Sequence, residues 1–246
     1  MVRRAVSNPN GGPPKARPPT FLVQSTSRRS ALPRRHRGDD VRGPNALDRY
    51  LLRRFSERGN VILDPFAGFG TILTLSEVMG RIPYGVERNA DRVRYARSRL
   101  KTPSHLVEGD ARDLVSFGFP KFDLCLTSPP YMTRDDPRNP LSHGGRGGYE
   151  QYLRDLLRIF REVRRAGRSG SRIVVEVSNL RIDASNRASG PVTLLAWDAA
   201  YRLSKVFEFE GEIVIGWKGT PAYHHGGTYG YGYDHSYCLV FRWGSG

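Results

Sequence analysis

From Leu47 to the end of the chain, short apolar runs alternate with longer amphipathic segments, and no other feature constrains the fold as strongly. The apolar runs are typical of buried strands, and the segments between them carry apolar residues at helical spacing. Strands separated by helices indicate a parallel sheet with helices packed on it. The sequence therefore predicts a doubly wound, Rossmann-like α/β fold with seven strands, at residues 61–63, 84–86, 105–107, 122–127, 173–177, 212–217 and 236–243.

The first predicted strand runs directly into Asp64-Pro65-Phe66-Ala67-Gly68-Phe69-Gly70-Thr71, where a helix begins. The two glycines of this turn let the backbone approach a ligand closely at the carboxyl end of the sheet. The turn is neither the dinucleotide fingerprint Gly-x-Gly-x-x-Gly nor a phosphate loop. Because an acid opens it, the turn repels a pyrophosphate but suits a ligand with an amino group and a sulfonium, such as S-adenosylmethionine.

Acids also end the next two predicted strands. Glu87 follows Asp64 by 23 residues, close to the offset of about 20 residues at which an acid holds ribose hydroxyls in nucleoside-binding folds. Asp110 is placed to accept a hydrogen bond from an adenine amino group. Each acid alone is equally consistent with a helix cap or a solvated side chain, but three acids ending three successive strands favour one ligand site.

The fourth strand stops at Ser128-Pro129-Pro130-Tyr131. The prolines lack N–H donors and fix φ, so the chain leaves the sheet in a rigid, extended direction. A hydroxyl and carbonyl oxygens here are able to accept the N–H bonds of a planar amine while the aromatic ring stacks on it. The alternative is a strand that merely ends at prolines, and the acidic turn upstream weighs against it.

In this order the motifs resemble the amino-methyltransferases of DNA, the N4-cytosine and N6-adenine methylase family, from about Asp39 to Trp243. The resemblance implies a class I methyltransferase fold with a mostly parallel seven-stranded sheet ending in an antiparallel hairpin, and S-adenosylmethionine as cofactor. It implies catalytic roles for Ser128, Pro129, Pro130 and Tyr131. The cofactor residues it implies are Asp64, Pro65, Phe66, Ala67, Gly68, Gly70, Thr71, Glu87, Arg88, Asp110 and Ala111.

The function implied by the resemblance is methyl transfer to an exocyclic amino group of a nucleobase, with cytosine N4 in DNA favoured by the Ser form of the catalytic loop. Its alternatives are N6-adenine methylation, methylation of RNA guanine N2 or of a protein glutamine amide, and a catalytically idle nucleic-acid-binding module. The cofactor turn precedes the catalytic loop, so the order is permuted relative to many members. A role in restriction-modification is a further expectation.

Net charge is +15, and ten Lys or Arg residues face two Asp in residues 1–46. A charge this positive favours a polyanionic partner, although GC-rich coding also enriches Arg. We therefore expect residues 1–46 to form a basic, Pro-rich arm, partly disordered, and residues 47–246 to form the catalytic domain. The expected partner is nucleic acid, DNA rather than RNA, with contacts from Arg134, Arg138, Arg146, Tyr229 and Tyr231.

The two cysteines, Cys125 and Cys238, lie in apolar runs and are expected to be small buried hydrophobes in a reducing compartment. No run approaches the roughly 18 apolar residues of a membrane span, so the expected location is the cytoplasm. The histidines lack ligand-spaced partners, and no metal site is predicted. The sequence makes no prediction of the oligomeric state.

Overall fold

The computed structural model describes residues 19–25, 32, 34, 45–142, 144–181, 191–218 and 234–244. The strands within these ranges are β1 (Phe21–Ser25), β2 (Val61–Asp64), β3 (Ile82–Glu87), β4 (Leu106–Glu108), β5 (Phe122–Thr127), β6 (Gly167–Val177), β7 (Glu208–Lys218) and β8 (His235–Arg242). The helices are α1 (Asn45–Phe55), α2 (Thr71–Val78), α3 (Ala90–Arg97), α4 (Tyr149–Ala166) and α5 (Leu195–Leu203), with short 3₁₀ helices η2 (Pro103–His105) and η3 (Ala111–Phe117).

The described strands form one sheet in the order β1-β7-β8-β6-β5-β2-β3-β4. Strands β2 to β6 pair in parallel, and β8 is antiparallel to both β6 and β7. The predicted fold and terminal hairpin are confirmed. The predicted count of seven strands is wrong, because an eighth strand, β1, pairs in parallel with β7 at the sheet edge.

Strand β1 lies inside residues 1–46, which we expected to form an arm. Pro18 and Pro19 closely precede it, and its five residues alternate between exposed and half-buried positions. Strand β7 offers this short edge strand a complete row of backbone partners, from Phe21 opposite Val214 to Ser25 opposite Lys218, and Leu22 packs against the core. Most of the arm lies outside the described residues.

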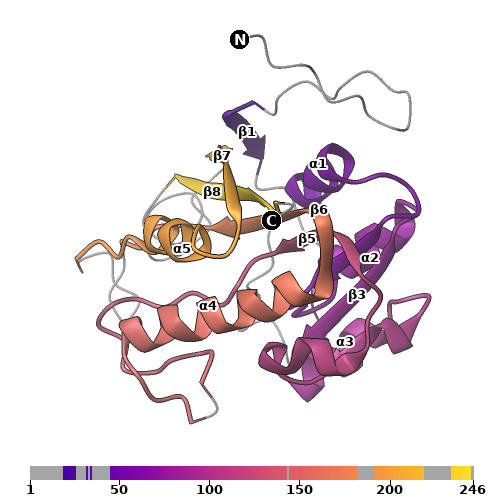
Figure 1. Ribbon diagram of the computed structural model, residues 1–246, viewed down its shortest axis with the longest axis horizontal. Helices are drawn as coiled ribbons and strands as arrows, with labels where there is room; N and C mark the ends of the chain where they lie inside the picture. The colour runs from indigo at the N-terminus through magenta and orange to yellow at the C-terminus, as the bar shows by residue number, and fades with distance from the viewer. Residues whose placement is uncertain are drawn as a thin grey trace.

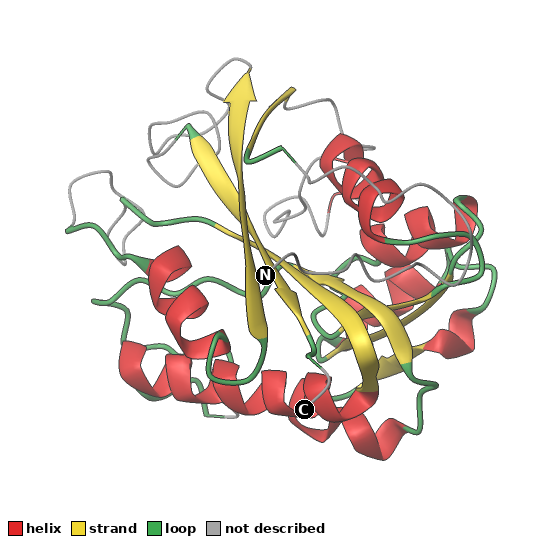
Figure 2. Ribbon diagram, turned by 45° about the horizontal axis from the view of Figure 1, so that its top comes forward, coloured by secondary structure: helices red, strands yellow, loops and turns green. Residues whose placement is uncertain are grey.

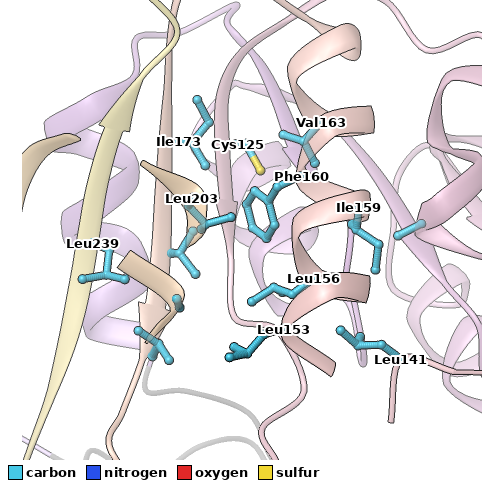
Figure 3. Packing of buried hydrophobic residues seen from close by; sticks show 14 of the residues in the cluster. Cys125, Leu141, Leu153, Leu156, Ile159, Phe160, Val163, Ile173, Leu203 and Leu239 are labelled. Atoms are coloured by element: carbon cyan, nitrogen blue, oxygen red, sulfur yellow. The ribbon is translucent and has the colours of Figure 1, made fainter. Parts of the chain in front are cut away.

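Helices cover both faces of the twisted sheet (Figure 2). On one face α1 and α2 pack against apolar side chains of β2, β5, β6 and β8. On the other face α4 lies along the sheet beside α5 (Figure 1). Figure 3 shows this second layer, in which Leu156, Phe160 and Val163 of α4 meet Cys125 of β5 and Ile173 of β6.

Helix α4 shows why the sequence forms this layer. Apart from Asp155, its buried positions are apolar and recur at helical spacing, while its outward positions are mainly arginine and glutamate. No helix in the described ranges combines the length and the apolar character needed to cross a bilayer. Helix α4 packs over β5 and β6, and the loop Ser128–Tyr131 extends from the carboxyl end of β5.

Candidate active site

The carboxyl ends of β2, β3, β4 and β5 border a cavity of about 780 Å³. Open α/β sheets bind ligands at this edge, and the volume lies within the range of small-molecule sites. Almost all of the predicted cofactor and catalytic residues line this one cavity. They are Asp64, Pro65, Phe66, Ala67, Gly68, Thr71, Glu87, Arg88, Asp110, Ala111, Ser128, Pro129, Pro130 and Tyr131.

Gly70 is the predicted cofactor residue that does not line the cavity. It has φ 73° and immediately precedes α2. A Cβ at this position would lie 2.8 Å from the Cβ of Ala96 in α3, closer than any real contact. Gly70 therefore serves the turn through its backbone conformation and through the close packing of α2 against α3.

Asp64 ends β2 and is only 2% exposed. Its Oδ1 accepts the Thr127 hydroxyl at 2.7 Å and the Phe66 N–H at 3.1 Å. Burial outweighs these two hydrogen bonds and raises the pKa of Asp64 to about 7, and repulsion from Glu87 adds to the rise. The carboxyl group therefore changes its charge near neutral pH, and it is bonded directly to the strand that leads into the catalytic loop.

Both oxygens of Glu87 accept backbone N–H groups. Oε2 accepts from Gly68 at 2.9 Å, and Oε1 accepts from Asn89, the N-cap of α3, at 2.7 Å. The carboxylate thus joins the turn after β2 to the start of α3. Because a carboxylate has about four acceptor positions, these two bonds leave capacity for the ribose hydroxyls that the sequence analysis assigned to Glu87.

Asp110 is held by an arginine that the sequence analysis missed. Arg112 Nε donates to Asp110 Oδ1 at 2.9 Å and its Nη2 donates to Oδ2 at 2.8 Å, a bidentate pair. Arg88 Nη1 lies 3.8 Å from the same Oδ2. The hydrogen bonds to Asp110 raise the pKa of Arg112. The acid predicted to accept from an adenine amino group therefore has a fixed cationic partner, which the Asp-x-Arg spacing in the sequence could have revealed.

The loop Ser128–Tyr131, predicted to be catalytic, is held from two sides at the end of β5. The hydroxyls of Ser128 and Tyr131 both donate to one carboxylate oxygen, Glu176 Oε2, at 3.0 and 2.9 Å. Glu176 is 7% exposed and lines the same cavity. From the helical layer, the Tyr152 hydroxyl donates to the Pro130 carbonyl at 3.0 Å. The loop therefore has a defined position relative to the cavity.

Sequence reasoning also missed Glu176. The parallel register pairs Thr127 of β5 with Val175 of β6, so the residues that follow, Ser128 and Glu176, lie side by side. One signal was present in the sequence: a lone carboxylate inside the apolar run Ile173–Val177. A charged residue in a central strand is seldom buried without a partner, and here its partners are the two hydroxyls of the catalytic loop.

Three of the five residues predicted to contact nucleic acid lie in the described part of the chain. Arg138 is exposed and lines the cavity. Arg134 is exposed but lies outside the wall of that cavity, and exposed Arg146 pairs with Arg138 through the backbone. Tyr229 and Tyr231 lie outside the described residues. Of the five residues, Arg138 therefore lines the cavity, and Arg134 and Arg146 lie elsewhere in the segment between β5 and α4.

Cys125 and Cys238 are both buried and free, as predicted, and burial raises the pKa of each thiol. Across the described ranges, no group of three or more His, Cys, Asp or Glu side chains is arranged to hold a metal ion.

Solved structures share this fold. TrmN from Thermus thermophilus aligns with a TM-score of 0.56 and 20% identity, over 85% of this chain and 52% of TrmN. A SAM-dependent methyltransferase from Methanosarcina mazei aligns with a TM-score of 0.54 and 13% identity, over 80% of this chain and 98% of that one. At these identities the likeness shows the fold, which is that of the class I S-adenosylmethionine-dependent methyltransferases.

A sequence comparison gives a more specific match, over a shorter part of the chain. The model of the DNA methylase family matches residues 19–98, which contain the Asp64–Thr71 turn. The resemblance to DNA amino-methyltransferases is thereby confirmed over that part of the chain. A proposed DNA modification methylase, also from Thermus thermophilus and solved with S-adenosyl-L-methionine, aligns at 29% identity over 56% of this chain and 52% of its own, with a TM-score of 0.41. This chain thus spans about half the length of TrmN and of that methylase. No curated protein matches the sequence.

Proposed function

We propose that the protein transfers a methyl group from S-adenosylmethionine to an exocyclic amino group of a nucleobase, with cytosine N4 in DNA as the first candidate. One observation carries the proposal: the hydroxyls of Ser128 and Tyr131 share the buried carboxylate of Glu176 at the wall of the cavity. Bound there, the cofactor supplies an electrophilic methyl group. The residues of the chain bind the cofactor and orient the amine that accepts the methyl group.

The donor and acceptor groups at the cavity suit this cofactor. Glu87 has acceptor capacity for ribose hydroxyls. Asp110 is fixed at the cavity wall by three hydrogen bonds from Arg112, and we assign it to the adenine amine. Asp64, at the bottom of the turn, attracts a cationic group when ionised. The glycine-containing turn allows the backbone to approach the ligand. The cavity therefore offers this cofactor both acidic side chains and a backbone turn that the ligand can approach closely.

An exocyclic amine on a nucleobase is a poor nucleophile because its lone pair is delocalised into the ring. The Ser128 hydroxyl donates its proton to Glu176, so its oxygen remains available to accept an N–H bond from the amine. A second acceptor is the Pro129 carbonyl, a backbone oxygen of a residue that lines the cavity. Acceptors fixed before the reaction favour the pyramidal amine in the transition state.

Tyr131 has a different role in this proposal. Its hydroxyl is bound to Glu176 Oε2 at 2.9 Å, so the orientation of the ring is fixed at the cavity wall. The ring is half-buried, which leaves part of it available for stacking against a base. Stacking of one base on an aromatic side chain contributes about 1–3 kcal/mol. A base within a duplex reaches this ring only after it has been flipped out of the helix.

Glu176 also provides an acceptor for the proton that the reaction releases. As nitrogen bonds to the methyl carbon, the bond from that carbon to the cofactor sulfur would break and leave its electron pair on sulfur. The nitrogen would then be cationic, and loss of one N–H proton restores the neutral amine. We propose that this proton passes to the Ser128 oxygen while the hydroxyl proton of Ser128 passes to Glu176 Oε2, 3.0 Å away. Ser128 is then unchanged, Glu176 is protonated, and solvent removes the proton at the end of the cycle.

Ser128→Ala and Glu176→Gln test these roles. Both variants should show the same rise in melting temperature with S-adenosylmethionine as the unmodified protein, because neither residue is assigned to cofactor binding. The initial rate of methyl transfer should fall on the order of 100-fold in each. Ser116→Ala, which removes an exposed hydroxyl of η3, is the matched control and should keep full activity. Unchanged rates in both site variants would contradict the assignment.

The methyl acceptor is identified by transfer of labelled methyl groups to DNA, tRNA and protein fractions, followed by analysis of the labelled base. The proposal expects N4-methylcytosine in DNA. If N6-methyladenine is found instead, the proposed amine chemistry stands and the assigned base is wrong. If the label is on guanine in RNA or on glutamine in protein, the proposed substrate class is wrong. Transfer to none of the fractions, with no stabilisation by the cofactor, would favour an idle binding module.

A further inference from the structure

Helix α5 carries an exposed apolar stripe. Leu194, Trp197 and Tyr201 follow one another at intervals of three and four residues, so they lie on one face of the helix. Their side chains are 43%, 44% and 66% exposed. The opposite face of the helix is fully buried in the core, through Leu195, Ala196, Ala199 and Leu203. Two large aromatic residues and a leucine thus lie together on one outward face. Contiguous exposed apolar groups of this kind tend to mark interaction sites.

The stripe begins next to the catalytic loop. The Arg134 N–H, three residues after Tyr131, donates to Thr193 Oγ1 at 3.0 Å. The backbone of Thr193 pairs with that of Leu180, which lines the cavity. Farther along α5, Asp198 accepts the Tyr149 hydroxyl of α4 at 2.9 Å, and Figure 1 shows α5 beside the first half of α4. The stripe therefore begins beside the loop that follows Tyr131 and beside a residue of the cavity wall.

Cationic groups lie at both ends of the stripe. At its start Arg134 is 55% exposed and lies 3.4 Å from Asp198. At its end Lys205 Nζ lies 4.6 Å from the centre of the Tyr201 ring. Proteins bind single-stranded nucleic acid by stacking the bases on aromatic rings and by placing positive charges beside the phosphates. The net charge of the chain, +15, is also positive and attracts the phosphates of a nucleic acid.

We propose that this stripe, which we call the α5 platform, binds the single-stranded nucleic acid that flanks the methylated base, with one base on Trp197 and another on Tyr201. The inference rests on the proposed function, because it supplies the substrate contact that the catalytic loop needs. The two rings are one helical turn apart, about 6 Å along the axis. A base in a duplex is already stacked on both faces, so the platform selects single-stranded or locally opened substrate.

The test measures fluorescence anisotropy of a labelled single strand of about 16 nucleotides, the upper end of the site sizes known for such binding, and of its duplex, titrated with the full chain. Trp197→Ala and Tyr201→Ala should each raise the Kd for the single strand by about fivefold to 150-fold, the range that stacking of one base spans. The slope of log K against log salt should stay the same, because the phosphate contacts remain. Lys205→Gln should reduce that slope by about 0.7, the value for one phosphate contact on a single strand.

Phe209→Ala is the matched control. Phe209 is 39% exposed at the start of β7, at the end of the sheet away from the catalytic loop, and its removal should leave the Kd unchanged. A Kd within about twofold of the unmodified protein in both Trp197→Ala and Tyr201→Ala would overturn the platform, because the loss of one stacked base exceeds that change. An equal loss in Phe209→Ala, or an equal loss for duplex and single strand, would also overturn it.

A methyl-transfer assay distinguishes a failure of the platform from a failure of the proposed function on which it rests. If the unmodified protein methylates DNA and the two aromatic variants show an unchanged KM, the platform is wrong and the proposed function stands. If the unmodified protein methylates no nucleic acid, the proposed function is wrong whatever the binding data show. Support requires a raised KM in Trp197→Ala and Tyr201→Ala with the same cofactor-dependent rise in melting temperature as the unmodified protein.

Discussion

Asp64 couples the stability of the fold to pH near neutrality. Burial raises its pKa from the ordinary value of 3.8 to about 7 in the folded chain. Between these two values the unfolded chain has lost a proton that the folded chain keeps, so the free energy of unfolding falls as pH rises. The slope is about 1.4 kcal/mol per pH unit, and the full interval amounts to about 4 kcal/mol. Above pH 7 this contribution is lost completely, and below pH 3.8 it is fully present.

Asp64→Asn removes the ionisation and keeps the shape of the side chain. Both hydrogen bonds that Asp64 accepts go to Oδ1, from Phe66 and Thr127, so the amide oxygen of Asn is able to accept both. The buried amide NH₂ lacks comparable partners, which costs about 1–3 kcal/mol. At about pH 4 the variant should be the less stable protein by that amount. At about pH 8 it should be the more stable one by about 1–3 kcal/mol, because the ionisation penalty of about 4 kcal/mol is absent.

Urea unfolding of both proteins at half-unit steps from about pH 4 to about pH 8 measures this. All other titratable groups are common to the two proteins, so the difference in their free energies of unfolding isolates Asp64. A difference that stays constant within about 1 kcal/mol over the whole range would refute the reasoning. S-adenosylmethionine gives a second readout: its stabilisation of the unmodified protein should grow as pH rises through about 7, because the ionised carboxylate attracts its cationic groups.

Three further predictions concern packing around the site. Phe160→Ala, at a fully buried ring of α4, should lower the free energy of unfolding by about 3–5 kcal/mol in urea titrations. Gly70→Ala combines a positive φ with a contact of 2.8 Å to Ala96, and should lower the free energy of unfolding by at least about 2 kcal/mol in the same assay. Tyr152→Phe removes the bond to the Pro130 carbonyl, and should cost about 1 kcal/mol of stability and reduce kcat more than it changes the melting-temperature response to the cofactor.

The cofactor side of the cavity could be predicted from the sequence because its signals are local. Asp64 through Thr71 lie within one turn of the chain, and a strand, two glycines and a helix fix their geometry without distant contacts. The same is true of Ser128 through Tyr131, where two prolines set the direction of the backbone. Alternation of strands and helices then brings both motifs to the same edge of the sheet, and in the structure they line one cavity.

Features that depend on distant pairing were not accessible in this way. Strand β1 exists because residues about 190 positions later present an open edge to it, and its own five residues lie in a Pro-rich segment. The α5 platform was hidden for a similar reason, since Trp197 and Tyr201 suit a helix core as well as a surface. Only the packing of the other face, through Leu195 and Leu203, turns them outward.

Strand β5 connects the two carboxyl groups that matter most to the proposed chemistry. Thr127 donates to Asp64 of β2, and the next residue, Ser128, donates to Glu176 of β6. Because β5 lies between β2 and β6 in the sheet, each acid reaches the end of β5 from a different neighbouring strand. A change of charge at Asp64 therefore acts on the hydrogen bond immediately before Ser128.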